Sequence, residues 1–167
     1  MMKVMRTVIK IDMKDKFPIV GPSAVVTKDM CDLNNHMNVV YYQHIFEDGC
    51  LGFFSEMGFT AEYFEEGFSS FTLETDIRYL KELLEGEKAY PYFRLVNLSP
   101  KLIHYAGIIL DESGEVSAFT ENVLAHVDMN VRKTSIMPEK VYSLLQNMLE
   151  EHNQTGDIGF DLRLKVK

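Results

Sequence analysis

Hydrophobic positions between residues 39 and 57 recur three and four apart along the chain. They are Val39, Tyr42, Ile45, Phe46, Gly49, Phe53 and Met57. This spacing predicts one helix over residues 38–57. Further apolar side chains widen the stripe: Tyr41, Cys50, Leu51 and Phe54. We therefore expect the helix to be buried on several sides and to end at Gly58.

Four later runs are rich in the β-branched and aromatic residues that favour strands. They span residues 69–80, 88–98, 101–110 and 115–129. The turns between the last three contain LSPK and DESGE, so these three should pair antiparallel. Pro91 lacks an N–H, which predicts an edge or a bulge at its position. The pattern indicates a four-stranded antiparallel meander after the helix.

Shorter elements complete the prediction. Residues 7–11 and 23–30 read as strands on either side of the turn FPIVGPS. Pro138 suits the first turn of a second helix over about 138–152. The tail, residues 153–167, is consistent with either a short strand or an unstructured end. A long apolar helix must be covered by a sheet, so the fold class is α+β. The sheet could curl around the helix or lie flat beneath it.

Composition limits the function. The chain has 167 residues, of which 46% are hydrophobic and 25% charged, as in one soluble globular domain. The 17 basic and 25 acidic residues give a net charge of −8, which argues against nucleic-acid binding. Two cysteines cannot build a disulfide framework, and this favours a reducing compartment. Early charges interrupt any signal-peptide pattern, and no run approaches the ~18 apolar residues of a membrane span. We expect a cytoplasmic protein.

A polar cluster precedes the predicted helix. Residues 32–38 read DLNNHMN. Their hydrogen-bonding side chains are Asp32, Asn34, Asn35, His36 and Asn38. Asp and Asn are ordinary helix caps, which is the simplest explanation. One cap needs one acceptor, however, so the excess predicts a site in which helix amides hold an oxyanion and a carboxylate activates a nucleophile.

Three other chemistries fit the cluster less well. A calcium loop would need a central glycine and a carboxylate at its twelfth position, where Gln43 stands. His36 and His44 are eight residues apart and no HExxH or CxxC pattern is present, so we expect no metal and no cofactor. Cys31 could be a nucleophile with His36 as its base, although no family signature surrounds it.

The cluster and the helix together match the pattern D-x-N-x-H-x-N-x(3)-Y-x(3)-F-x-D. The matching residues are Asp32, Asn34, His36, Asn38, Tyr42, Phe46 and Asp48. This resembles the active-site stretch of the hotdog-fold acyl thioesterases, the 4-hydroxybenzoyl-CoA and acyl-carrier-protein thioesterase-like superfamily. Residues 71–87 and 114–138 resemble two strands of that family, and the likeness covers about residues 18–145. It is nearest to the betainyl-CoA thioesterases.

The resemblance implies one hotdog domain over residues 1–167, in which a curved antiparallel sheet wraps a long central helix. It implies hydrolysis of an acyl-CoA thioester to a free acid and CoA, with a small polar acyl group such as betainyl. The active site would lie between protomers of a homodimer or homotetramer. A non-catalytic acyl-CoA-binding sensor or scaffold is the alternative, and a dehydratase is less favoured. The family pattern leaves open whether the thiol carrier is CoA or acyl carrier protein.

Roles carry over position by position. Asp32 matches the acid that serves hotdog thioesterases as general base or nucleophile, and Asn34 and His36 match the Asn and His of the acyl-carrier-protein thioesterase motif. Val39 and Val40 stand where helix amides polarise the thioester carbonyl. The remaining substrate contacts implied are Asn38, Tyr42, Phe46 and Asp48. Two residues depart from the pattern: Asn35 replaces a common Gly, and Asp76 replaces the His usual in betainyl-type enzymes.

The negative charges of CoA require local basic residues in an acidic chain. The candidates are Arg78, Lys81, Lys88, Lys101, Arg132 and Lys133. Most lysines and arginines are solvated surface residues, which is the simplest expectation for these six. His104 and His126 lie in predicted strands and are expected to be core or surface residues. The aromatic residues should be mostly core, with some lining an acyl pocket or a cage for a quaternary ammonium.

Overall fold

The computed structural model describes residues 12–166 and contains one antiparallel sheet flanked by helices. The strands are β1 (Ile19–Val20), β2 (Ala24–Val25), β3 (Phe68–Tyr79), β4 (Lys88–Leu98), β5 (Leu102–Leu110), β6 (Val116–Asp128) and β7 (Lys133–Thr134). The helices are η1 (Met13–Lys16), η2 (Lys28–Met30), α1 (Val39–Gly49), α2 (Leu51–Glu56), α3 (Ala61–Glu65) and α4 (Glu139–Asn153). The main strand order is β1-β4-β5-β6-β3, with β2 on β4 and β7 on β6.

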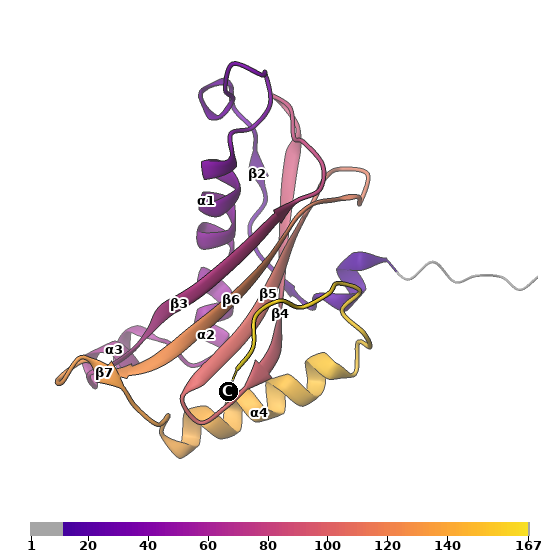
Figure 1. The fold of residues 1–167 in the computed structure, drawn as a ribbon. Coiled ribbons are helices and arrows are strands. Elements are labelled where there is room, and N and C mark those ends of the chain that lie inside the picture. Colours follow the sequence, from indigo (N-terminus) through magenta and orange to yellow (C-terminus); the bar gives the residue numbers. More distant parts are fainter. Residues whose placement is uncertain (1–11, 167) are drawn as a thin grey trace, which may run out of the picture.

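The sheet curves around α1 and α2, and α4 runs across one end (Figure 1). Bulges interrupt the register in β3, β4 and β6, and such bulges increase the twist and bend of a sheet. The core between helix and sheet contains Phe53 and Phe93, whose rings stack at 6.0 Å, together with Tyr105. The curled arrangement, rather than the flat one, is the one observed, and it is the hotdog fold.

The predicted helix over residues 38–57 is divided. α1 ends at Gly49 and α2 begins at Leu51, because the ψ angle of Cys50 is −3° instead of a helical value near −42°. A Cβ at Gly49 would come within 2.9 Å of the Pro91 ring, and a Cβ at Gly21 would come within 2.6 Å of the Gly49 carbonyl oxygen. The break thus occurs where the helix presses against β4. The predicted end is confirmed, since α2 ends at Glu56, Met57 is its C-cap, and Gly58 follows with a φ of +92°.

The four long strands are confirmed, but the predicted meander is wrong. β3 pairs with β6, from Phe68 opposite Asp128 to Tyr79 opposite Ala118, and does not pair with β4. Residues 80–87 cannot make a tight β3–β4 turn because they are bound elsewhere: the Met37 amide donates to the Leu83 carbonyl at 2.8 Å. β3 therefore lies at one edge of the sheet. Within residues 12–166, no strand pairs with the edge of β3 that faces away from β6.

Other predictions have mixed outcomes. The strand at residues 7–11 lies outside the described residues. Of the strand predicted at residues 23–30, Ala24–Val25 is formed, and the chain then turns into η2 so that the next residues can reach the end of α1. The second helix is confirmed as α4. The prediction of an edge or a bulge at Pro91 is wrong, because β4 lies between β1 and β5 and its bulge is at Leu95–Asn97. The Pro91 carbonyl accepts from the Gly21 amide at 2.9 Å, at the interval between β1 and β2.

A second hydrophobic cluster covers the other face of the sheet, which we call the outer face. It consists of Phe17, Ala106, Ile108, Leu110, Phe119 and Ile158. Residues after α4 contribute to it, although they form neither helix nor strand. The tail is thus an ordered segment that crosses the sheet on the side away from α1 (Figure 1). Among the described residues, no helix has the length and apolar character needed to cross a membrane.

Candidate active site

Residues 31–37 form a tight loop that delivers the polar cluster to the start of α1. Cys31 and Met37 pair as an isolated antiparallel bridge, and the Asp32 amide donates to the His36 carbonyl at 3.1 Å. The reversal requires a left-handed residue, and Asn35 supplies it with a φ of 63°. Asn tolerates this conformation better than most residues. Asn35 therefore meets the conformational requirement of this turn.

Asp32 is held at the base of this loop. Its Oδ1 accepts a hydrogen bond from the Asn34 amide at 2.8 Å, which is an Asx-turn. The Asp32 side chain is 30% exposed, so water can reach it. No hydrogen bond from the described residues reaches its Oδ2. Because α1 has a different cap, Asp32 is not the helix-capping residue, and its carboxylate is available for chemistry.

His36 lies between two carboxylates. Its Nε2 is 3.7 Å from Asp32 Oδ1, and its Nδ1 is 3.7 Å from Glu82 Oε2. Both distances are longer than a hydrogen bond, but catalytic contacts often tighten only when substrate is bound. Sequence reasoning missed Glu82, which belongs to the charged run KELLEGE and looks like solvated surface. The pairing of His36 with Leu84 and the hydrogen bond from the Met37 amide to the Leu83 carbonyl bring that run to the site.

Asn38 is the true N-cap of α1. Its Oδ1 accepts from the Val40 amide at 3.1 Å, and its own amide donates to the Met30 carbonyl. The Val40 amide is therefore already engaged within the chain. The Val39 amide has no hydrogen-bond partner among the described residues and points from the positive end of the helix. Of the two predicted oxyanion donors, Val39 is the one that the geometry leaves open.

The remaining predicted substrate contacts have different surroundings. Tyr42 is 3% exposed, and its hydroxyl accepts from the Leu83 amide at 3.1 Å and donates to the Lys81 carbonyl at 3.3 Å. Burial raises the pKa of this hydroxyl. Phe46 is buried against Phe93 in the core, whereas Asp48 is exposed on α1. Tyr42 and Phe46 thus fix the position of the helix, and Asp48 lies apart from the loop.

A cavity of about 240 Å³ adjoins the loop. Its lining residues are His36, Met37, Val39, Tyr42, Tyr79, Leu80, Lys81 and Glu82. Tyr79, at the end of β3, thus lines the same cavity as the His36 imidazole and as Val39, whose amide has no partner among the described residues. A larger cavity of about 780 Å³ lies between α3 and α4, lined by Tyr63, Val141 and Leu144 among others, and it shares no residue with the polar cluster.

The other chemistries find little support in the described part of the chain. No group of three metal-ligating side chains occurs within residues 12–166. His44 is exposed and lies against the Tyr41 ring, at 5.7 Å between ring centroids. The Cys31 thiol donates to the Thr27 carbonyl at 3.6 Å. The structure thus associates His36 with carboxylates and not with a thiol.

Two of the six basic candidates form ion pairs with acidic side chains of the same chain. Arg78 bonds Glu121 at 3.1 Å, and Lys81 bonds Glu115 at 2.7 Å and also Asp111. The other four are exposed and make no ion pair within residues 12–166: Lys88, Lys101, Arg132 and Lys133. Arg132 lies 5.5 Å from the Phe71 ring centroid. The exposed basic residues are the ones free to meet a phosphate.

His104 and His126 are core residues, as one of the two expectations had it. The His126 Nε2 lies 2.7 Å from the Tyr63 hydroxyl, and its Nδ1 lies 3.0 Å from Ser135 Oγ. His104 bonds Glu121 at 3.2 Å. Burial lowers the pKa of both imidazoles, so both are neutral at pH 7.

With the geometry established, comparisons with known proteins identify the family. A model of the thioesterase-like superfamily matches residues 25–145. The chain belongs to the thioesterase-like superfamily. A protein of Agrobacterium fabrum, named L-carnitine dehydrogenase/betainyl-CoA thioesterase, is 30% identical over 132 residues, covering 79% of this chain and 27% of its own length. The chain thus spans about a quarter of that relative.

Two further comparisons fit this membership. The betainyl-CoA thioesterase of Pseudomonas aeruginosa is 24% identical over 129 residues, covering 76% of this chain and 81% of its own length. A hypothetical protein of Staphylococcus aureus, solved in complex with CoA, superposes with a TM-score of 0.71 at 22% identity. That superposition covers 86% of this chain and 94% of the other. The structural likeness establishes the hotdog fold, and the sequence matches establish the superfamily.

Proposed function

We propose that the protein is a thioester hydrolase that converts an acyl-CoA to a free acid and CoA. One observation supports this most directly. The Asp32 carboxylate, which is not needed as a helix cap, lies 3.7 Å from His36, and His36 lines the same cavity as Val39, whose amide has no partner among the described residues. A base and an oxyanion donor are therefore presented from one end of one helix.

The chemistry needs little more than these groups. A thiolate leaves readily because the pKa of a thiol is near 8.5, so no strong general acid is required. Asp32 would act as general base on water or as nucleophile on the carbonyl carbon. The Val39 amide would stabilise the oxyanion, and one such donor contributes roughly 3–4 kcal/mol. Asn34 and His36 would orient the water or the substrate.

The substrate class follows from the relatives. The matched proteins of Agrobacterium fabrum and Pseudomonas aeruginosa both carry betainyl-CoA thioesterase as all or part of their names. We infer a small polar acyl group, with betainyl as the first candidate. Asp76 does not bear on this choice directly, because its side chain pairs with Arg78 and Arg163 on the outer face and not with the site.

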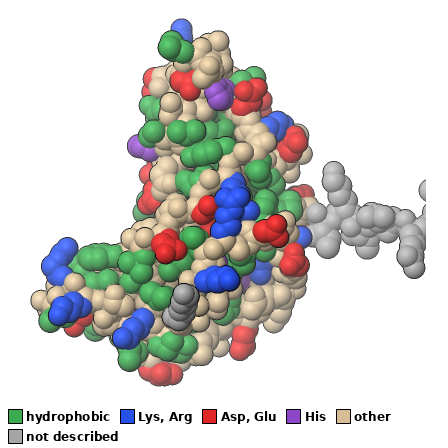
Figure 2. Space-filling view, in the orientation of Figure 1, with side chains coloured by type: hydrophobic (Ala, Val, Ile, Leu, Met, Phe, Trp, Pro, Cys, Tyr) green, Lys and Arg blue, Asp and Glu red, His purple; other side chains and the backbone are tan. Residues whose placement is uncertain are grey.

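The assembly is inferred to be a homodimer formed through β3, with a tetramer as the higher alternative. Within residues 12–166 no strand pairs with the edge of β3 that faces away from β6. The backbone groups along that edge form a template for another strand. β3 and the residue directly after it carry four exposed hydrophobic side chains: Phe71, Leu73 and Tyr79 in the strand, and Leu80 after it. Hydrophobic side chains gather along this side of the molecule (Figure 2). Tyr79 and Leu80 line the cavity beside His36, so a partner on this edge would complete the site. A monomer in light scattering at micromolar concentration would contradict the assembly.

The compartment is inferred to be the cytoplasm. Cys31 and Cys50 are both free thiols, as is common in a reducing compartment. Cys50 is buried, and burial raises the pKa of its thiol to about 12, so it is not a reactive nucleophile.

A panel of acyl-CoAs with detection of released thiol tests this function. We expect turnover of at least one short polar acyl-CoA, with betainyl-CoA among the first to try and the matching acyl-pantetheine as a probe of carrier recognition. Tight binding of acyl-CoA without thiol release across the panel would instead favour a sensor or scaffold. The same panel identifies the acyl group.

A further inference from the structure

The segment after α4 lies on the outer face of the sheet with specific contacts. We call residues 157–166 the strap. Ile158 is 8% exposed and packs into the second hydrophobic cluster. The Phe160 ring stacks on the Phe119 ring of β6 at 4.1 Å between centroids. Two apolar anchors thus hold the strap, although it forms no helix or strand.

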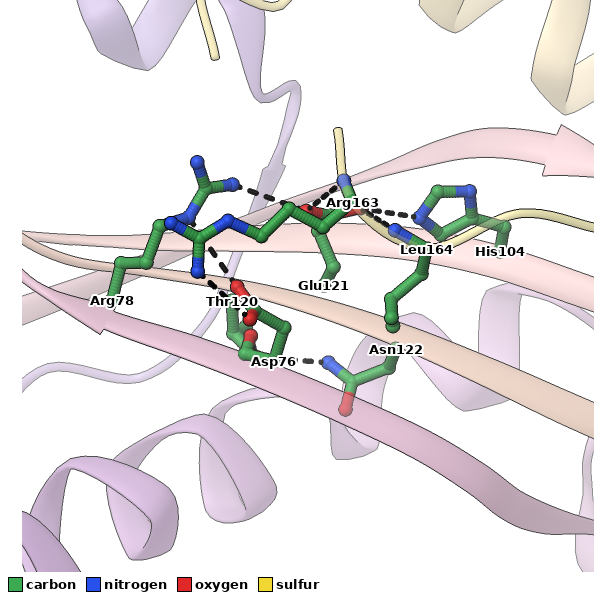
Figure 3. A network of polar contacts seen from close by, with 8 residues as sticks. All are labelled: Asp76, Arg78, His104, Thr120, Glu121, Asn122, Arg163 and Leu164. Atoms are coloured by element: carbon green, nitrogen blue, oxygen red, sulfur yellow. Dashed lines mark hydrogen bonds and ion pairs between the residues drawn. The ribbon is translucent and has the colours of Figure 1, made fainter. Parts of the chain in front are cut away.

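A buried carboxylate holds the strap further along. Glu121 of β6 is fully buried, and four donors surround its two oxygens (Figure 3). The sheet supplies Arg78 at 3.1 Å and His104 at 3.2 Å. The strap supplies the amides of Arg163, at 2.9 and 3.1 Å, and Leu164, at 3.2 Å. A buried carboxylate without hydrogen-bond donors is energetically costly. The amides of the strap therefore supply donors that the Glu121 carboxylate needs in addition to those of the sheet.

The strap also reaches the edge strand. Arg163 Nη1 lies 3.1 Å from Asp76 Oδ2, and Asp76 Oδ1 lies 3.4 Å from Arg78 Nε (Figure 3). The strap therefore contacts β3 as well as β6. The family match ends at residue 145, so the strap lies outside the region shared with that family model.

The strap covers apolar surface that would otherwise face water. Beneath and beside it lie Phe119 and Ile108, both fully buried, and Leu110, which is 3% exposed. A contiguous apolar patch of this kind on a sheet commonly serves as a protein interface. We propose that the strap is an internal partner that excludes a second copy of the chain from the outer face. Self-association is then confined to the edge of β3. This favours the dimer proposed above over a tetramer in which the outer faces of two sheets stack on each other.

The test releases the strap in the full-length chain. The double variant Ile158→Asp/Phe160→Asp places charges on the apolar anchors and leaves every sheet residue unchanged. We expect the Arg163 and Leu164 amides to exchange with solvent about tenfold faster or more. We also expect the mass in light scattering to rise to at least twice the wild-type value, in a concentration-dependent way. The control is Lys165→Asp, which changes the charge equally at an exposed strap residue and should behave as wild type.

Several outcomes overturn the proposal. One is a released strap, seen by fast exchange, with an unchanged mass. A second is that the Arg163 and Leu164 amides of the wild type exchange as fast as exposed amides. A third is that these two amides stay protected from exchange in the double variant. If the double variant does not fold, Phe160→Ala removes one anchor with less disruption and is expected to show the same two changes in smaller degree. Neither readout depends on thioester hydrolysis, so failure here is distinct from failure of the proposed activity.

Discussion

The carboxylate of Asp32 and the imidazole of His36 face each other at 3.7 Å across a loop of five residues, directly before α1. The loop brings them together through the left-handed Asn35 and through the Asx-turn of Asp32. The N-cap of the helix is a separate residue, Asn38. Helix capping thus falls to Asn38, whereas the chemistry that we propose falls to Asp32, so the two roles can be tested separately.

Asn38→Ala should lower stability without removing the Asp32 carboxylate, to which we propose a catalytic role. Loss of an N-cap side chain costs about 1 kcal/mol. For a chain of this size that corresponds to a drop in Tm of roughly 2–4 °C, measurable by differential scanning calorimetry. Asn38→Asp retains the acceptor and adds a charge that the helix N-terminus favours, so it should match or exceed the wild-type Tm. Equal losses in both variants would contradict the capping role.

Asn35→Val should destabilise the loop, whereas Asn35→Gly should be nearly neutral. The φ of 63° costs a β-branched residue about 1–2 kcal/mol, and glycine adopts it without penalty. Urea unfolding of the three proteins measures the difference. We also expect the Val variant to lose turnover, because the turn positions Asp32. A Val variant as stable as wild type would show that the left-handed turn is not required.

Acid should destabilise the protein in part through His152. The Nδ1 of this residue accepts from the Leu95 amide at 2.8 Å, and burial, followed by the nearby Arg94, lowers its pKa to about 4. The unfolded state, with an ordinary pKa near 6.5, binds the proton more readily. Stability from the neutral imidazole is therefore present above pH 6.5 and is lost as the pH falls toward 4.

His152→Asn isolates this effect, because the amide oxygen can accept from Leu95 but does not titrate. Between pH 7 and pH 5 the wild type should lose about 2 kcal/mol more unfolding free energy than the variant. Urea titrations at the two pH values measure it. His104 and His126 are unchanged in both proteins, so their contribution cancels in the comparison. Parallel losses in the two proteins would exclude His152 as the cause.

The elements of this fold that the sequence predicts are those set by local pattern. The four long strands and α4 follow from hydrophobic periodicity, which depends only on near neighbours. The pairing of β3 with β6 does not, because it depends on residues 80–87 binding the loop before α1 and leaving no tight turn to β4. The break at Cys50 likewise depends on a close approach to Pro91 that no local signal records.

In the candidate site, too, some features follow from the local sequence and others depend on distant contacts. The motif from Asp32 to Asn38 could be found from the density of polar side chains before an apolar helix. Which of them caps the helix could not be predicted, because Asp32 and Asn38 are both good caps and the choice depends on the backbone path. Glu82 and the strap were missed because their roles depend on His36 and Glu121, each about 40 residues or more away in the chain.

Asp32→Asn tests the central claim most directly. The amide keeps an oxygen for the Asn34 amide, and Asn38 still caps α1, so the Tm should be nearly unchanged. Asp29→Asn, a nearby exposed position with the same charge change, is the control and should keep wild-type turnover. On the acyl-CoA that the panel identifies, the account predicts that kcat of Asp32→Asn falls by about a hundredfold or more, within the range of general-base catalysis. Full turnover by a folded Asp32→Asn protein would contradict the assignment of the active site.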